Sequence, residues 1–396
     1  MPTFDMLVVG VGGGPDETNL SAYLVKPCGT SWKDGIIALE AGSGQGALNQ
    51  ILAHHPGILA SCCETSDEVA SQTYSAAELY SFVQCYLISH AHLDHVNSLV
   101  ISAGSLRGPR KRIYAADQTL RDLETIFSDR IWPNLASWKE SDEDFKLLYT
   151  TLACDGKYQS ISEQISVRTM PLSHGTAAGD GSPGAHEPYT SSAFFIRHDA
   201  SSHEFLFFGD VEPDSLAHLP RTIDVWRAAA PKIPARLSTV FIECSWPADR
   251  RDDMLYGHLN PPHLVAALLA LATEVVKARS AATSPRSPVP SSQVESPERV
   301  PLRKKHRKNP SSPSDLTGSL DGLTVYIIHC KHDLNERPGA RPVRERILLE
   351  VQDLVAPHCL GVEILAVEQG MRLGNDTPIS FGPQFDQVCL QNLDLS

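Results

Sequence analysis

His90-Ala91-His92-Leu93-Asp94-His95 places three imidazoles and one carboxylate within six residues, directly after the apolar run 83–88. Neutral imidazole and carboxylate are the ligands that borderline-soft divalent metals bind. His90 and His92 lie two residues apart in an extended or loop segment, so they can converge on one metal ion. Asp94 and His95 follow at the start of an expected helix and can turn toward a second. The stretch therefore predicts a two-metal centre.

The composition fits a globular enzyme and argues against a general nucleic-acid binder. The chain has 396 residues, of which 42% are hydrophobic, enough for a core of ordinary size. It contains 34 Lys and Arg against 47 Asp and Glu, a formal net charge of -13. Nucleic-acid affinity depends on Lys and Arg that neutralise phosphates. A small anionic substrate remains compatible, because two metal ions dominate the field of their own pocket.

Cysteine usage and the start of the chain bear on location. The nine cysteines are odd in number and include no Cys-x-x-Cys pair, which favours free thiols in a reducing compartment. Residues 1–5 lack a basic and apolar leader, and no run approaches the roughly 18–20 apolar residues of a membrane span. We expect a cytoplasmic protein that neither enters a membrane nor binds nucleic acid, and the sequence leaves a homodimer open.

Short strands bounded by Gly and Pro alternate with helical patterns, which predicts an α/β class with mixed sheets. Strands are expected at 6–11, 22–26, 35–40, 83–88, 111–115, 165–170, 192–197, 204–208, 239–243 and 323–328. Helices are expected at 67–83, 93–103, 262–277 and 344–354.

Residues 280–319 differ from the rest of the chain. They are rich in Ser and Pro, contain almost no aliphatic run, and include the basic cluster 303–308. Such a segment buries too little apolar surface to fold, so we expect a disordered insertion in one domain that spans 1–396. The basic cluster is either a nuclear-import or phosphate-binding patch or, more commonly for so short a run, a solvated loop.

Further metal-ligand candidates follow later strands. His174 follows the strand expected at 165–170, Asp210 closes the run 204–208, and His329 ends the strand expected at 323–328. Ligands gather at the carboxyl ends of strands in sheet-based α/β folds. A carboxylate such as Asp210 can bridge two cations about 3.5–4 Å apart. Alone, each residue would be a strand cap or turn residue, and the hexapeptide favours the metal interpretation.

Two further residues are candidates for proton transfer. Glu243 ends the strand expected at 239–243, and His258 lies in the following loop. A histidine oriented by a carboxylate can act as general acid for a leaving alkoxide; the alternative is a helix-entry cap beside a structural acid. Weaker candidates for pocket lining are His263, His332, Lys331, Asn19 and Asp16. Tyr189, Phe194 and Phe195 could stack on a base, although core packing suits the two Phe at least as well.

The hexapeptide and its surroundings resemble one family. The His-x-His-x-Asp-His spacing is that of dinuclear hydrolases with the metallo-β-lactamase fold. Leu93 before Asp94 and the small Ser98 in Val96-Asn97-Ser98-Leu99 are similar to the class II cyclic-nucleotide phosphodiesterases, the fungal low-affinity 3′,5′-cyclic-AMP enzymes. Further similar stretches are 10–24, Leu172-Ser173-His174-Gly175, 208–214, Ile242-Glu243-Cys244-Ser245, Gly257-His258-Leu259 and Ile328-His329-Cys330-Lys331. The resemblance covers nearly the whole chain except 280–319.

The resemblance implies a metallo-β-lactamase-like αβ/βα four-layer sandwich with two mixed sheets, and two divalent ions, most often Zn²⁺. Its ligand set would assign one metal to His90, His92 and His174, the other to Asp94, His95 and His329, and the bridge to Asp210. His258 competes with His329 for the second metal, and we prefer His329 because it ends a strand.

The expected reaction is hydrolysis of 3′,5′-cyclic AMP, and also of cyclic GMP, to the nucleoside 5′-monophosphate. His258, steadied by Glu243, would protonate the departing 3′ oxygen. One alternative is a tRNA 3′-processing endonuclease of the same superfamily, against which the net charge and the lack of a basic docking arm count. The other is a non-catalytic scaffold, against which the intact ligand set counts. The sequence does not decide between adenine and guanine.

Overall fold

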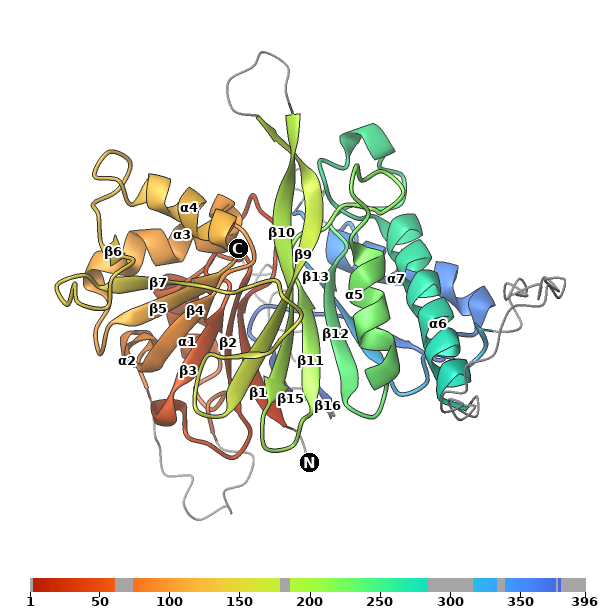
Figure 1. The fold of residues 1–396 in the computed structure, drawn as a ribbon, viewed down its shortest axis with the longest axis horizontal. Coiled ribbons are helices and arrows are strands. Elements are labelled where there is room, and N and C mark those ends of the chain that lie inside the picture. The colour runs from red at the N-terminus through yellow and green to blue at the C-terminus, as the bar shows by residue number, and fades with distance from the viewer. Residues whose placement is uncertain are drawn as a thin grey trace, which may run out of the picture.

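Two mixed β-sheets form the centre of the molecule in the computed structural model, which describes residues 3–60, 74–178, 186–283, 316–332, 339–374 and 377–378. The first sheet has the strand order β16-β15-β1-β2-β3-β4-β5-β7-β6. The second has the order β14-β13-β12-β11-β10-β9-β8. Figure 1 shows the strands in the middle, with α2, α3 and α4 on one side and α5, α6 and α7 on the other.

The first sheet and its helices come mainly from the N-terminal half. Its strands are β1 Phe4–Gly10, β2 Ala22–Pro27, β3 Ile36–Leu39, β4 Val83–Leu87, β5 Lys111–Ala115, β6 Ala136–Ser137, β7 Leu147–Thr151, β15 Arg372–Gly374 and β16 Thr377–Pro378. The covering helices are α1 Gln45–His54, α2 Ala76–Phe82, α3 Leu93–Ser102 and α4 Asp117–Ile126.

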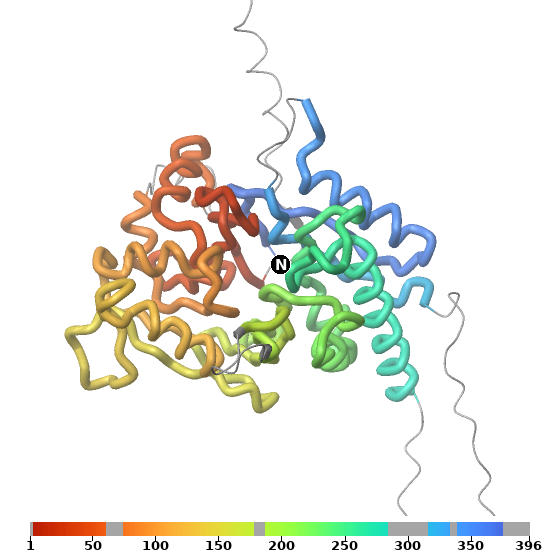
Figure 2. The backbone as a smooth tube through the Cα atoms, turned by 90° about the horizontal axis from the view of Figure 1, so that it is seen from above, coloured from red at the N-terminus to blue at the C-terminus, as the bar shows by residue number. Residues whose placement is uncertain are grey.

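The second sheet and its helices come from residues 159–366. Its strands are β8 Gln159–Ser160, β9 Ile165–Ala178, β10 His186–His198, β11 Glu204–Phe208, β12 Leu237–Glu243, β13 Thr324–Ile328 and β14 Glu363–Ala366. The covering helices are α5 Thr222–Ala229, α6 Pro261–Thr283 and α7 Val343–Val355. Figure 2 shows the two halves from above, red to yellow on one side and green to blue on the other.

Three hydrophobic clusters confirm the predicted four layers. One lies between the sheets and includes Phe205 and Phe207 of β11. The alternate residues Leu206 and Phe208 point to the opposite face, into the cluster under α5, α6 and α7. A third cluster lies between the first sheet and α1 to α4. This period of two is why β11, buried on both faces, is apolar at nearly every position.

Several expected elements differ in extent from those observed. β9 continues past residue 170 to Ala178, because β10 pairs with it through an antiparallel ladder that extends to His186↔Ala178. His174 therefore lies inside a strand rather than after one. Of the helix expected at 67–83, residues 76–82 are helical and 61–73 lie outside the described part.

Both edges of the insertion expected at 280–319 lie in the described part of the chain. Helix α6 continues to Thr283, and Ser319 is buried, so both edges belong to the folded part. Residues 284–315, including the basic cluster 303–308, lie outside the described residues. No helix in the described part of the chain is long and apolar enough to cross a membrane.

Candidate metal centre

The hexapeptide lies at the junction of β4 and α3. β4 is buried except at Gln84, and its end places the fully buried His90 at the edge of the first sheet. His92 is exposed and caps α3, whose first turn contains Asp94 and the buried His95. A carboxylate in the first turn of a helix is favoured by the helix dipole. The strand-to-helix turn therefore points four potential ligands to one place.

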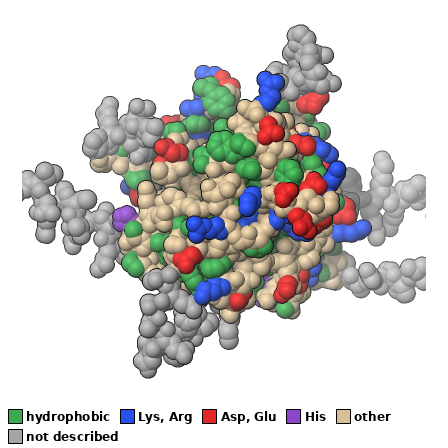
Figure 3. Space-filling model, turned by 90° about the vertical axis from the view of Figure 1, so that its left-hand side faces the viewer, with side chains coloured by type: hydrophobic (Ala, Val, Ile, Leu, Met, Phe, Trp, Pro, Cys, Tyr) green, Lys and Arg blue, Asp and Glu red, His purple; other side chains and the backbone are tan. Residues whose placement is uncertain are grey.

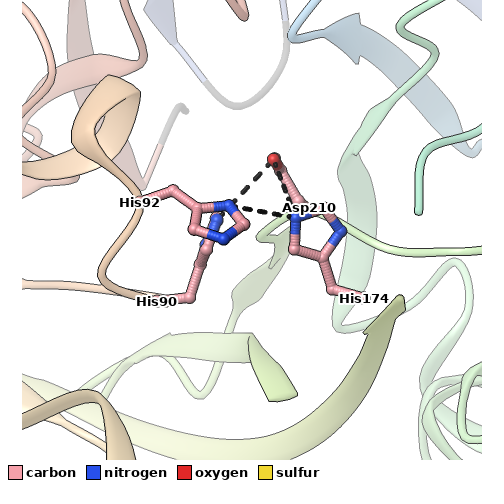
Figure 4. Close-up of side chains that lie close together, drawn as sticks. All are labelled: His90, His92, His174 and Asp210. Carbon is pink, nitrogen blue, oxygen red and sulfur yellow. Dashed lines mark hydrogen bonds and ion pairs between the residues drawn. The ribbon is translucent and has the colours of Figure 1, made fainter. Parts of the chain in front are cut away.

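His90, His92, His174 and Asp210 form the first potential ligand group, with their ligand atoms all within 4.8 Å of one another. The Nε2 atoms of His90 and His174 lie 3.7 and 3.6 Å from Asp210 Oδ2. His174 Nε2 is 3.3 Å from His92 Nδ1. Figure 4 shows the three rings and the carboxylate pointing toward a common centre.

Asp94, His95, Asp210 and His329 form the second group, by the same 4.8 Å limit. His95 Nε2 is 3.3 Å from Asp210 Oδ1, and His329 Nε2 is 3.1 Å from Asp210 Oδ2. His329 Nε2 is also 3.5 Å from Asp94 Oδ2. Asp210 therefore belongs to both groups, which is the position that a bridging carboxylate requires.

Glu243 and His258 form a buried pair beside both groups. His258 Nδ1 lies 3.1 Å from each carboxylate oxygen of Glu243 and 3.7 Å from Asp210 Oδ2. Glu243 also accepts hydrogen bonds from the Val211 backbone N–H at 2.7 Å and the Ser245 hydroxyl at 2.5 Å. These fixed donors hold the carboxylate and, through it, the imidazole orientation. A further potential ligand group contains His174, Asp210, Glu243 and His258.

The donor atoms at the centre suit metal ions. His90 Nε2, His95 Nε2 and Asp210 Oδ2 are buried and have no hydrogen-bond partner among the described residues. Leaving buried polar atoms unpaired costs free energy, so native proteins rarely do it without a bound ion or water. Imidazole nitrogens with carboxylates are the donors that Zn²⁺ takes. The residues present therefore fit divalent metal ions.

Surrounding polar groups orient the ligands. Ser89 Oγ lies 3.0 Å from His90 Nδ1, and Ser21 Oγ lies 3.0 Å from His329 Nδ1. His174 Nδ1 donates to the Gly257 carbonyl at 2.8 Å. Such partners fix the ring orientation of a metal-binding histidine.

Glu40 orients the ring of His95 in the same way, and this role was not expected from the sequence. Its Oε2 lies 3.4 Å from His95 Nδ1, and its Oε1 accepts from the Ser89 backbone N–H at 3.1 Å. Glu40 has φ of 58°, in the left-handed region that costs a non-glycine residue energy. Its place directly after β3, at the same edge as His90, is the signal that could have identified it.

Burial sets the protonation of the site in the absence of ions. It lowers the pKa of His174 and of His258 to about 4, which keeps both rings neutral, and the neutral form is the one in which His174 can bind a metal. Burial, and then the nearby Asp210 carboxylate, raises the pKa of Glu243 to about 7. Burial alone would raise the pKa of Asp210, but His329 and His95 outweigh it and hold that pKa well below its ordinary value.

The weaker sequence candidates lie in three different places. Lys331 Nζ lies 3.6 Å from Asp94 Oδ2 and donates to the Gly13 carbonyl at 2.6 Å, so it borders the centre. His332 lies near Asn19 (3.4 Å) and Asp16 (3.6 Å), and none of these three residues belongs to a potential ligand group among the described residues. His263 instead pairs with Asp252 at 2.9 Å.

Of the three aromatic residues that could stack on a base, two are excluded by their burial in the core and one lies near the centre. Phe194 and Phe195 are fully buried in the two cores on either side of the second sheet, because successive strand residues face opposite ways. Neither can contact a substrate. Tyr189 remains near the centre, where its ring stacks on His92 with centroids 4.7 Å apart and planes 8° apart.

A sandwich of two mixed sheets flanked by helices, with histidines and a shared aspartate at one edge, defines a hydrolase of the metallo-β-lactamase fold. The model of the class-II cAMP phosphodiesterases matches residues 8–370. The chain belongs to this family, so its reaction is the hydrolysis of a cyclic-nucleotide phosphodiester.

Individual relatives agree with this assignment. The chain is 32% identical over 283 residues to a 3′,5′-cyclic-nucleotide phosphodiesterase of Schizosaccharomyces pombe, covering 68% of this chain and 75% of that protein. It is 28% identical to a 3′,5′-cyclic-nucleotide phosphodiesterase of Aliivibrio fischeri, covering 93% and 92% of the two chains, so the likeness extends beyond fungi. Unliganded yeast PDE1 has the same fold, with a TM-score of 0.72, 23% identity and coverage of 94% and 100%.

Proposed function

We propose that the chain hydrolyses 3′,5′-cyclic AMP and cyclic GMP to nucleoside 5′-monophosphates, with two Zn²⁺ ions in the site. The observation that supports this most directly is that Asp210 is shared by two ligand groups, with the Glu243–His258 pair beside both. Two adjacent cations and one proton donor are what cleavage of an unactivated phosphodiester needs.

The proposed ligands follow the two groups. His90, His92 and His174 would hold one ion, Asp94, His95 and His329 the other, and Asp210 both. When bound, the ions supply hydroxide near neutral pH and offset negative charge on the phosphoryl oxygens. His258 stays outside this set because its Nδ1 faces Glu243.

The residues of the chain bind, orient and transfer a proton. Gly13 packs against His329 so closely that an added Cβ would lie 2.6 Å from Nε2, and this closes one side of the centre. Glu243 binds Nδ1 of His258 and thereby leaves Nε2 for the substrate. The pair holds a proton that His258 delivers to the departing 3′ oxygen. Lys331 adds a positive charge where the phosphate must lie.

The first alternative function, tRNA processing, requires an extended basic surface that binds the RNA. On the face shown in Figure 3, Lys and Arg side chains are interspersed with Asp and Glu, with no continuous basic area. The second alternative, a scaffold without activity, would not need the buried ligand atoms at the centre that have no hydrogen-bond partner among the described residues.

The test is turnover by the full chain, with zinc content measured on the same sample. We expect two Zn²⁺ per chain and hydrolysis of cyclic AMP and cyclic GMP to 5′-monophosphates, with no cleavage of pre-tRNA. Cleavage of pre-tRNA alone, or a zinc-loaded protein without turnover, would contradict the proposal.

A further inference from the structure

A cavity of about 630 Å³ opens beside the metal centre and includes His92 and His174 in its wall. α4 contributes Asp122, Thr125 and Ile126, and the rest of the lining comes from Ala91, residues 175–177, Tyr189 and the loop at Tyr256 and Gly257. A volume of several hundred Å³ suits a bound small molecule. Because two proposed ligands form part of its wall, a molecule in this cavity can reach the metals directly.

The position of the proton donor places the ribose and base in this cavity. This step rests on the proposed function, in which His258 protonates the 3′ oxygen. That oxygen belongs to the ribose, so the ribose must lie against His258 and its neighbour Gly257. Gly257 lines the cavity and is tied to His174 through its carbonyl. The base, attached to the same ribose, then points away from the metals into the space between Tyr256 and α4.

A second cavity near the centre is less accessible from the proposed metal ligands. A cavity of about 420 Å³ lies behind His329, between the 11–19 loop and α7. His329 is the only proposed ligand in its lining, and Gly13 packs over the Nε2 edge of that ring. Its Arg344 is already paired with Glu368 at 2.5 Å. A nucleotide with its phosphate on the metals would not extend into it.

The walls of the larger cavity suit an aromatic, neutral base. Tyr189 stacks on His92 and is thereby held in place. Tyr256 is 64% exposed although it is aromatic, and it has φ of 53°, in the left-handed region that costs a bulky residue energy. Asp122 and Ile126 are four residues apart and so share one face of α4. Tyr256 and Ile126 provide the apolar contact area that a base requires.

Asp122 is the only charged residue in the described lining of this cavity. It is half-buried, and its Oδ1 accepts from the Gln118 amide at 2.9 Å, which fixes the carboxylate. No Lys, Arg or His in the described chain forms an ion pair with it, so its second oxygen remains available to a ligand. A carboxylate accepts hydrogen bonds and cannot donate them.

We propose that Asp122 selects the base and makes guanine the preferred one. Guanine presents two adjacent donors, N1–H and the 2-amino group, that a carboxylate can accept together. Adenine presents only its 6-amino group there, next to the N1 lone pair that a carboxylate repels. Cyclic GMP is therefore a better substrate than cyclic AMP, with hypoxanthine in cyclic IMP, which keeps N1–H but lacks the amino group, between them.

Steady-state kinetics of the zinc-loaded full chain on cyclic GMP, cyclic IMP and cyclic AMP tests this assignment. Asp122→Asn replaces one acceptor by a donor, so the ratio of kcat/KM for cyclic GMP to that for cyclic AMP should fall about tenfold or more, mainly through KM. Asp117→Asn is the matched control, because Asp117 is exposed at the start of the same helix and outside the cavity. The control should leave the ratio within about twofold of the wild type.

Binding of GMP and AMP to the same samples, measured by calorimetry, separates two kinds of failure. A wild type that turns over the cyclic nucleotides but gives the same ratio after Asp122→Asn, with unchanged GMP binding, overturns the role of Asp122 alone. A zinc-loaded wild type that neither turns over nor binds any of these nucleotides overturns the proposed function as well.

Discussion

Replacement of His258 by Ala tests the proton donor. His258 is buried, with Nδ1 3.1 Å from both oxygens of Glu243, and lies outside the two groups assigned to the metals. A positioned general acid contributes about 10²- to 10⁴-fold, so kcat for a cyclic nucleotide should fall by this factor, equivalent to about 3–5 kcal/mol. Zinc content should stay at the wild-type value.

The assay compares two leaving groups. The 3′ oxygen of ribose needs a proton to depart, whereas a nitrophenolate departs without one, so a nitrophenyl phosphodiester should lose less than about tenfold in kcat. His263→Ala is the matched control, because His263 lies five residues later and pairs with Asp252 away from the centre. Equal losses on both substrates with zinc retained, or full turnover of the cyclic nucleotide, would refute the assignment of His258 as the acid.

Four further outcomes are expected. Asp94→Ala should lose activity and about half of the bound zinc together, measured by atomic emission, and loss of activity with both ions retained would contradict its place as a ligand. Glu40→Gln removes the carboxylate 3.4 Å from His95 Nδ1 and should weaken zinc binding about 10- to 100-fold in a chelator competition, whereas unchanged affinity would mean that Glu40 does not support the site. Because the pKa of Glu243 is raised to about 7, the protonated form of the Glu243–His258 pair is present below that pH and is lost above it, so kcat should fall as the pH rises above about 7. Glu243→Gln should abolish this fall and lower the highest kcat of the pH profile. Removal of zinc by a chelator should lower Tm, since an ion at about 100 times its Kd adds about 2.7 kcal/mol to the free energy of unfolding, and added Zn²⁺ should restore it. An unchanged Tm would show that zinc does not stabilise the folded state.

The strands were largely predictable because their period and boundaries are local properties. The run from Glu204 to Phe208 and the run from Lys111 to Ala115 match β11 and β5 residue for residue. The extension of β9 beyond residue 170 was not predictable, since it depends on pairing with β10 across the hairpin. Helix α4, with its mixed polar pattern, also went unpredicted, although it contributes Asp122 to the cavity.

The candidate site shows the same division. The seven proposed ligands could be named from the sequence because each follows or lies near an apolar strand run, and the family resemblance placed them in order. Glu40 directly follows β3 and Ser21 directly precedes β2, and both were missed because such a position alone does not distinguish one acid or hydroxyl from the others in the chain. The sequence left Phe194 and Phe195 open between base stacking and core packing, because one sequence cannot show that both faces of β10 are covered.

The sequence by itself determined the chemistry: the hexapeptide 90–95 specifies metal-binding side chains, and the alternating apolar runs specify sheets that place them at strand ends. Only the tertiary structure decided which of these side chains come together, because Asp210 contacts four histidines from three different segments. It also decided where a base can lie, since the cavity forms only when α4, β10 and the β12–α6 loop surround the same space. The physical reason is that each side chain by itself determines which metals it can bind. The distance between two side chains far apart in the sequence depends instead on how the two sheets pack together.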